Sequence, residues 1–115
     1  GRIFEGTHSQ MLESLNKIKK LPRNTKIYCG HEYTQNNLNF CSEIENTNHF
    51  LREKKEWVNA RINKKLPTIP VTIEEELNTN IFLRCDNPSV KKSLGMDSST
   101  ELEIFKKLRD LKDSF

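Results

Sequence analysis

The sequence predicts a mostly helical α+β fold, because helical spacing recurs along the chain while one segment has the composition of a strand. Apolar residues recur three or four positions apart in five or six segments, which is the spacing of one helix face. The exception is residues 25–29, TKIYC, where β-branched and aromatic residues gather. Turn signals built on proline, asparagine and glycine separate these segments.

The first predicted helix covers residues 7–20. Thr7 can cap its N-terminus, and Gln10, three positions later, completes a capping box. One face carries the apolar residues Met11, Leu12, Leu15 and Ile18. The helix should end before Pro22, because the residue preceding a proline is pushed out of helical geometry.

Two further helices are predicted over residues 36–44 and 48–64, the second opened by Asn48. The apolar residues of the longer helix are Phe50, Leu51, Trp57, Val58, Ala60 and Ile62. The stretch after it begins extended around two prolines and turns helical at Thr72. There the threonine hydroxyl can cap the helix while Glu75 reaches back.

The last third of the chain is predicted to hold two short helical segments and one longer helix. The short ones run through residues 81–83 and from Asn87 to about Gly95. Ser98 with Glu101 forms the predicted cap of the final helix. The apolar residues expected on its buried face are Leu102, Phe105, Leu108 and Leu111.

Composition predicts a small domain with a thin core. Hydrophobic residues make up 34% of the 115 residues and charged residues 30%. Such a chain is marginally stable alone, so we expect it to dock against another domain or subunit. The net charge of +3 comes with basic pairs scattered along helix faces, so no nucleic-acid surface is expected. No apolar run approaches membrane-spanning length, so no membrane partner is expected either. Three widely spaced cysteines favour reduced thiols in the cytoplasm.

The single predicted strand has no partner among the predicted elements. A lone strand cannot satisfy its own backbone hydrogen bonds. We therefore expect residues 25–29 to pair with strands that lie outside this chain. The sequence also begins with Gly1 rather than methionine, so it reads as truncated on its N-terminal side.

Five stretches in order carry a resemblance to a known family. They are GRIFEGT, KIYCGHEYT followed by NNLNF, the pair Glu56-Trp57, PTIPVTIEEELNTNIFLR, and LRDLKDSF. Together they resemble the C-terminal part of hydroxyacylglutathione hydrolase, also called glyoxalase II. The resemblance implies a fragment of that fold. Residues 1–34 would be the C-terminal edge, helix plus strand, of a metallo-β-lactamase αββα sandwich, and residues 35–115 the helical domain that binds the glutathione thioester.

The resemblance also implies chemistry. The family hydrolyses S-D-lactoylglutathione to glutathione and D-lactate, a step of methylglyoxal detoxification, with two metal ions, usually zinc. The histidine of the GHEYT motif, here His31, is one of the family's metal ligands. From the residues alone, a lone histidine after a strand is more often a loop or structural histidine than a metal ligand. His8 and His49 are read as structural, and Cys29 as a packed strand residue.

Four residues correspond to the family's glutathione-binding positions. Arg109 and Lys112, three apart in the last helix, match its Arg-x-x-Lys motif, and Tyr33 and Arg2 match two further contacts. Without the resemblance, the two helix residues would be a solvated basic end that complements the helix dipole. Phe4 stands where many members carry a tyrosine, so its hydroxyl donor is absent.

The remaining metal ligands of the family, including its THxHxDH motif, would lie upstream of this sequence. We therefore expect no thioesterase activity from the 115 residues alone. Three readings stay open at this point. The chain is the C-terminal segment of a hydrolase that needs its N-terminal half, or an inactive remnant, or a small helical interaction module.

Overall fold

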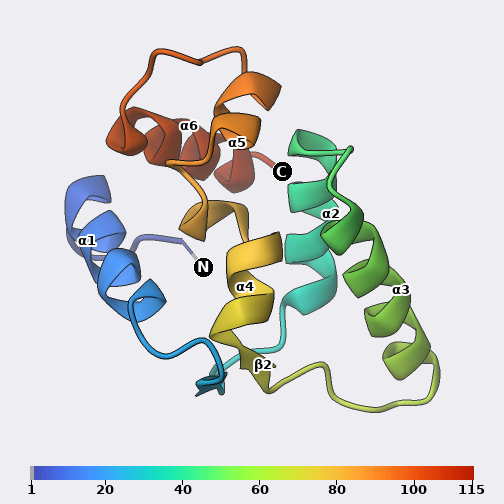
Figure 1. Cartoon of the computed structure of the whole chain (residues 1–115). Coiled ribbons are helices and arrows are strands. Elements are labelled where there is room, and N and C mark those ends of the chain that lie inside the picture. Colours follow the sequence, from blue (N-terminus) through green and yellow to red (C-terminus); the bar gives the residue numbers. More distant parts are fainter. Residues whose placement is uncertain (1) are drawn as a thin grey trace. The chain divides into compact units, whose positions relative to one another are not determined.

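The computed structural model describes residues 2–115, and it is mostly helical with one small sheet (Figure 1). This confirms the mostly helical α+β prediction. In chain order the elements are α1 (His8–Lys19), β1 (Lys26–Ile27), α2 (Thr34–Ile44), α3 (His49–Asn63), β2 (Val71–Thr72), α4 (Ile73–Thr79), the 3₁₀ turn η1 (Ile81–Leu83), α5 (Pro88–Ser93) and α6 (Glu101–Asp113). None of the helices among these residues is long and apolar enough to cross a bilayer.

The described chain divides into two compact units. A terminal unit combines residues 2–20 with residues 81–115, and a central unit comprises residues 21–80. These boundaries differ from the division at residues 34 and 35 that the family resemblance implies. That division refers to the complete enzyme, and it stays a prediction.

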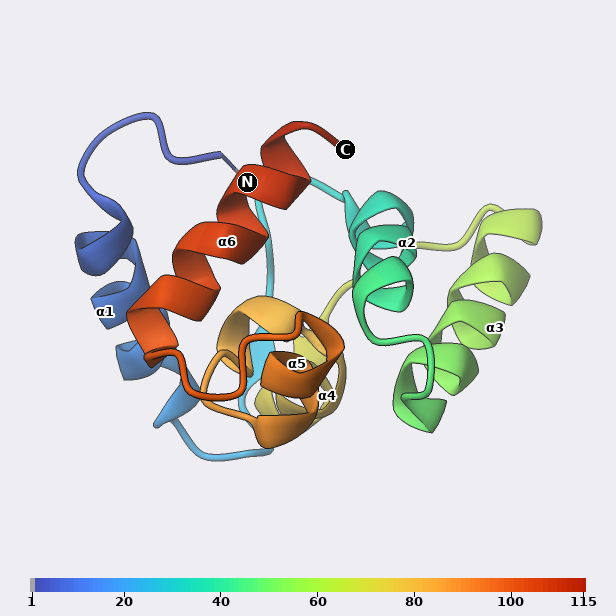
Figure 2. The same cartoon turned by 90° about the horizontal axis from the view of Figure 1, so that it is seen from above.

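In the terminal unit, α1 packs against α6 and η1, as Figure 2 shows for the two helices. The capping box predicted from the sequence forms at the start of α1. The Thr7 hydroxyl accepts from the Gln10 N–H at 3.1 Å, and the Gln10 side chain accepts from the Thr7 N–H at 2.9 Å. The buried hydrophobic residues of this unit are Leu12, Ile81, Leu83, Cys85, Val90, Ile104, Phe105 and Leu108.

The N-cap of helix α6 lies two residues later than predicted. Thr100, not Ser98, is the N-cap, and it forms a capping box with Glu103. Both threonine and serine are followed by glutamate three positions on, so the sequence offers two overlapping capping boxes. In the structure the later one forms. The buried residues of the helix are Ile104, Phe105, Leu108 and Arg109, whereas the predicted members Leu102 and Leu111 are half-buried.

In the central unit, α2 and α3 lie side by side and α4 packs against α3 (Figure 1). Asn48 caps α3 as predicted, because its side chain accepts from the Phe50 and Leu51 N–H groups. The buried hydrophobic residues of this unit are Leu38, Phe40, Cys41, Leu51, Val58, Val71 and Ile73. Of the apolar residues of α3, Leu51 and Val58 are buried, whereas Phe50, Trp57, Ala60 and Ile62 are exposed.

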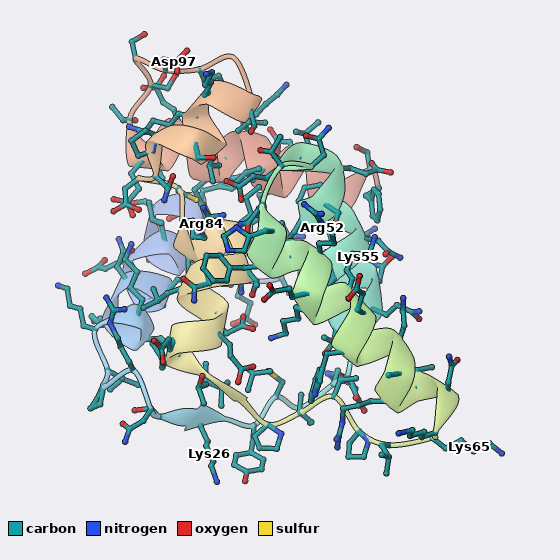
Figure 3. All side chains as sticks on the ribbon, turned by 45° about the vertical axis from the view of Figure 1, so that its right-hand side comes forward. Lys26, Arg52, Lys55, Lys65, Arg84 and Asp97 are labelled. Carbon is teal, nitrogen blue, oxygen red and sulfur yellow. The ribbon has the colours of Figure 1, made fainter. Side chains whose placement is uncertain are left out.

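The strand after α1 pairs inside the chain, which corrects the expectation that its partners lie elsewhere. Strand β1 is antiparallel to β2, with Lys26 opposite Thr72 and Ile27 opposite Val71. The pairing is possible because the proline-containing stretch before α4 is extended and supplies a complementary edge. Lys26 extends outward from this sheet in Figure 3.

Candidate functional site

The segment between β1 and α2 carries two aromatic rings that stack on each other. The imidazole of His31 and the phenol ring of Tyr33 have centroids 5.2 Å apart and planes 4° from parallel. Both residues are exposed, Tyr33 to 56%. We call His31 and Tyr33 the ring pair. The sequence singled out both residues, and the structure brings them together.

The residues that alternate with the ring pair are bound to one buried threonine. Glu32 accepts hydrogen bonds from both the backbone N–H and the hydroxyl of Thr68. The hydroxyl oxygens of Thr68 and Thr34 lie 2.9 Å apart. Thr68 is 1% exposed, and its side-chain and backbone donors lower the pKa of the Glu32 carboxyl. Residues 32 and 34 therefore anchor the segment that presents residues 31 and 33.

Helix α3 holds the segment that contains Thr68. The Nε of Arg61 donates to the carbonyl oxygen of Pro67 at 2.5 Å, and its guanidinium lies 4.9 Å from the centre of the Trp57 ring. Lys65, with a φ of 56°, makes the turn that leads out of the helix (Figure 3). The ring pair, Thr68 and Arg61 all belong to the central unit.

The positively charged residues that were predicted to bind glutathione lie in the terminal unit. Arg109 is 5% exposed, and its Nε and Nη2 donate to one carboxylate oxygen of Asp113 at 3.1 and 2.9 Å. Its guanidinium also lies 5.0 Å from the centre of the Phe82 ring. This side chain is therefore fixed inside the unit and is not part of a solvated helix end.

Arg2 and Lys112 lie close to the same end of α6. Arg2 is exposed and donates to the backbone carbonyl of Asp113 at 3.3 Å. The Lys112 ammonium lies 5.7 Å from the centre of the Phe115 ring. Asp113 thus binds two of the predicted substrate residues, Arg109 through its carboxylate and Arg2 through its carbonyl. Phe4, where many family members have tyrosine, is 90% exposed.

Within residues 2–115, no three histidine, cysteine or acidic side chains gather as a metal site. His31 offers one imidazole, which is a common zinc ligand, but one donor cannot hold a metal alone. The other two histidines contact aromatic rings. His8 meets Phe105 edge-on at 6.3 Å, and the rings of His49 and Phe50 lie 4.1 Å apart.

Cys29 does not match its predicted role as a packed strand residue. Strand β1 ends at Ile27, and the thiol of Cys29 is exposed. The sequence reasoning also missed Glu32, Thr68 and Asp113. All three lie inside the stretches that carried the resemblance, but a sequence does not show which polar residues in a motif contact each other.

Comparison with known proteins places the chain in a family. The family model described as the C-terminus of hydroxyacylglutathione hydrolase matches residues 32–115. A hydroxyacylglutathione hydrolase of Pelagibacter ubique is 53% identical over 115 residues, which are 100% of this chain and 42% of that protein. One from Bartonella tribocorum is 46% identical over 115 residues, 100% of this chain and 46% of the relative.

A third relative, the hydroxyacylglutathione hydrolase of a Chelativorans species, is 43% identical over 115 residues, which are 100% of this chain and 45% of the relative. The chain thus spans a little under half the length of each of these proteins. The matched family model also covers all the helices from α2 to α6. The chain therefore belongs to the hydroxyacylglutathione hydrolase family and corresponds to its C-terminal part.

Proposed function

We propose that this chain is the C-terminal part of a metal-dependent glutathione thioester hydrolase that converts S-D-lactoylglutathione and water to glutathione and D-lactate. The observation that carries the proposal is the match over the whole chain to relatives of that name, at 53% identity for one of them. The substrate, the metals and the need for a metallo-β-lactamase half are parts of the proposal. They follow from the family and from the chemistry of the residues below.

His31 is the proposed metal ligand of this chain. Its ring is exposed and stacked on Tyr33, so the imidazole is held in a defined orientation and can still reach a metal ion. Two bound metal ions, zinc in the first instance, would supply a hydroxide nucleophile at neutral pH by lowering the pKa of bound water. The other ligands would come from the part of the enzyme that the relatives have in addition to the matched residues.

Arg2, Tyr33, Arg109 and Lys112 are the proposed substrate-binding residues. Glutathione carries two carboxylates, which fixed guanidinium and ammonium groups bind through charge-assisted hydrogen bonds. Asp113 holds Arg109 through two hydrogen bonds, so little side-chain entropy is left to lose on binding. Tyr33 adds a phenol hydroxyl as a neutral donor.

Complementation tests the proposed reaction. The 115-residue chain is mixed with a separately expressed N-terminal part of the Pelagibacter ubique relative in the presence of zinc, and thioester hydrolysis is followed. We expect no turnover from either piece alone and measurable turnover from the mixture. H31A should abolish that turnover, whereas H49A, which removes an exposed histidine of the same unit, should retain it.

Two results would contradict the proposal. Zinc-dependent hydrolysis by the purified 115-residue chain alone would show that its residues suffice. No turnover from a mixture of two folded pieces would favour the alternative, an inactive remnant or a small helical binding module.

Lys112 gives a test of substrate binding that is separate from metal binding. K112A should raise the KM for the thioester roughly tenfold, the effect of losing about 1.4 kcal/mol of a charge-assisted contact. K107A removes an exposed lysine from the same helix and should leave KM unchanged. Equal KM values for the two variants would remove Lys112 from the site.

We also propose a reducing compartment, the cytoplasm, for this protein. Among the described residues the three cysteines form no disulfide, and two of them, Cys41 and Cys85, are buried. Disulfides are typical of oxidising compartments, so cysteines that do not cross-link support this placement.

A further inference from the structure

We infer that Thr68 and Glu32 are positioning residues that fix the ring pair, so that the His31 imidazole is presented in one orientation. This inference rests on the proposed role of His31 as a metal ligand. It adds two residues that do not touch metal or substrate and that act through the backbone between them and His31.

The first support is the alternation of contacts along the segment. Glu32 and Thr34 both contact Thr68. His31, just before Glu32, and Tyr33, between Glu32 and Thr34, carry the exposed stacked rings. Two anchor points two residues apart fix the backbone on both sides of Tyr33. The stack then fixes the orientation of the His31 ring relative to Tyr33.

The second support is the direction of the hydrogen bonds. An ionised carboxylate only accepts, so the single hydroxyl proton of Thr68 is directed to Glu32. The Thr68 oxygen is then free to accept from the Thr34 hydroxyl, which lies 2.9 Å away. The buried Thr68 hydroxyl therefore bonds to both Glu32 and Thr34. Valine at position 68 would remove both hydroxyl contacts.

The third support is the lack of regular structure around the ring pair. Residues 28–33 belong to no helix or strand, and Tyr33 provides no side-chain cap for α2. Before residues 28–33, backbone hydrogen bonds join the chain around β1 to the chain around β2. The Ile73 N–H donates to the Thr25 carbonyl at 3.0 Å, and the Glu74 N–H donates to the Arg23 carbonyl at 2.9 Å. After Ile27, the contacts of Thr68 are what join these two segments.

The test observes the His31 ring in the 115-residue chain without metal or substrate. Histidine ring carbons are labelled with ¹³C, and the His31 signal is assigned by its loss in H31Q. Stacking on Tyr33 should shift the His31 ring protons upfield, and Y33L should remove that shift. We expect T68V to give the Y33L value, while T68S, which keeps the hydroxyl, restores the wild-type value.

T79V is the matched control. Thr79 is also buried in the central unit, and its hydroxyl bonds to the Glu75 carbonyl of its own helix at 2.8 Å. T79V should therefore keep the wild-type His31 shift. Amide spectra show whether each variant is folded, and E32A replaces T68V if the latter does not fold, because Glu32 is exposed.

A wild-type shift in both T68V and E32A would overturn the inference, as would the absence of any upfield shift in the wild-type chain. These outcomes are independent of the proposed function, because the measurement needs no metal, substrate or turnover. Failure of complementation with the His31 shift behaving as expected would refute the proposed function alone.

Discussion

Arg109 and Asp113 form an ion pair one turn apart on α6, with the Arg109 Nη2 2.9 Å from the Asp113 carboxylate. The arginine side chain is buried on the face of α6 that also carries Ile104, Phe105 and Leu108, whereas Asp113 is exposed. A buried guanidinium needs a partner, because burying an unpaired charge is costly. Asp113 thus both stabilises the terminal unit and holds Arg109, a residue proposed to bind the substrate.

Removal of the Asp113 charge should destabilise the terminal unit. D113N keeps the shape of the side chain but weakens both hydrogen bonds to Arg109, so we expect a loss of roughly 1–3 kcal/mol in the free energy of unfolding. Urea unfolding followed by circular dichroism measures it. D110N removes the same charge from an exposed neighbour on α6 and should change stability by less than about 0.5 kcal/mol. Equal effects of the two substitutions would show that the Arg109 pair contributes nothing.

The N-cap of α6 gives a second prediction. Thr100 accepts from the Glu103 N–H at 3.2 Å, so T100A should cost about 1 kcal/mol of unfolding free energy. S98A alters the cap predicted from the sequence and should leave stability unchanged. Thermal unfolding of both variants measures the difference. A larger loss in S98A than in T100A would place the start of the helix at Ser98 after all.

Glu103 should make stability depend on pH in the acid range. Hydrogen bonds from the Thr100 backbone N–H and side chain lower the pKa of Glu103 from its ordinary value of 4.5. A lowered pKa in the folded state stabilises that state above pH 4.5, and this contribution is lost as the pH falls through the lowered value. Unfolding of wild type and E103Q from pH 7 to pH 2 tests this. E103Q should lose less stability on acidification, and parallel curves would contradict the prediction.

Substitution of the two glutamates that pair with Lys54 should lower stability by unequal amounts. The buried Lys54 ammonium lies 3.3 Å from Glu76 and 3.5 Å from Glu75, and the Glu76 carboxylate also accepts from Asn80 at 2.8 Å. Glu75 is exposed and more screened by water, so E75Q should cost less than about 1 kcal/mol. E76Q should cost roughly 1–3 kcal/mol. Urea unfolding compares the pair, and an equal or larger effect of E75Q would contradict the assignment.

The three cysteines should differ in reactivity. Burial raises the pKa of the Cys85 thiol to about 12, so at pH 8 only about one molecule in ten thousand carries the reactive thiolate. Cys41 is also buried, whereas Cys29 is exposed. Brief treatment with iodoacetamide should therefore add one group, at Cys29, as read by mass spectrometry of peptides. C29S should remove the fast labelling, and rapid modification of Cys85 would contradict its burial.

Local signals in the sequence were sufficient for most helices and for the family. The caps at Thr7, Asn48 and Thr72 were predicted, and each accepts the expected backbone hydrogen bond. These contacts join residues two or three positions apart, so the chain carries the information locally. The resemblance that led to the family rested on five stretches of sequence, and the comparisons confirm it.

At three points tertiary structure decided what the sequence left open. The strand pairs with β2, a partner more than forty residues away, whereas we expected partners outside the chain. Of the two overlapping capping boxes at the start of α6, the folded chain forms the one at Thr100, which the sequence alone did not distinguish from the one at Ser98. The sequence could not show that Arg109 is buried either, because the Phe82 ring that its guanidinium contacts is distant in sequence.

The candidate site shows the same division. His31, Tyr33 and Arg109 could be predicted as site residues from the sequence, because each lies in a short stretch that resembles the family. The Thr68–Glu32 contact beside the ring pair and the Asp113–Arg2 contact join residues 36 and 111 positions apart. Such contacts depend on how distant segments fold back on each other, which helix periodicity and local capping do not specify.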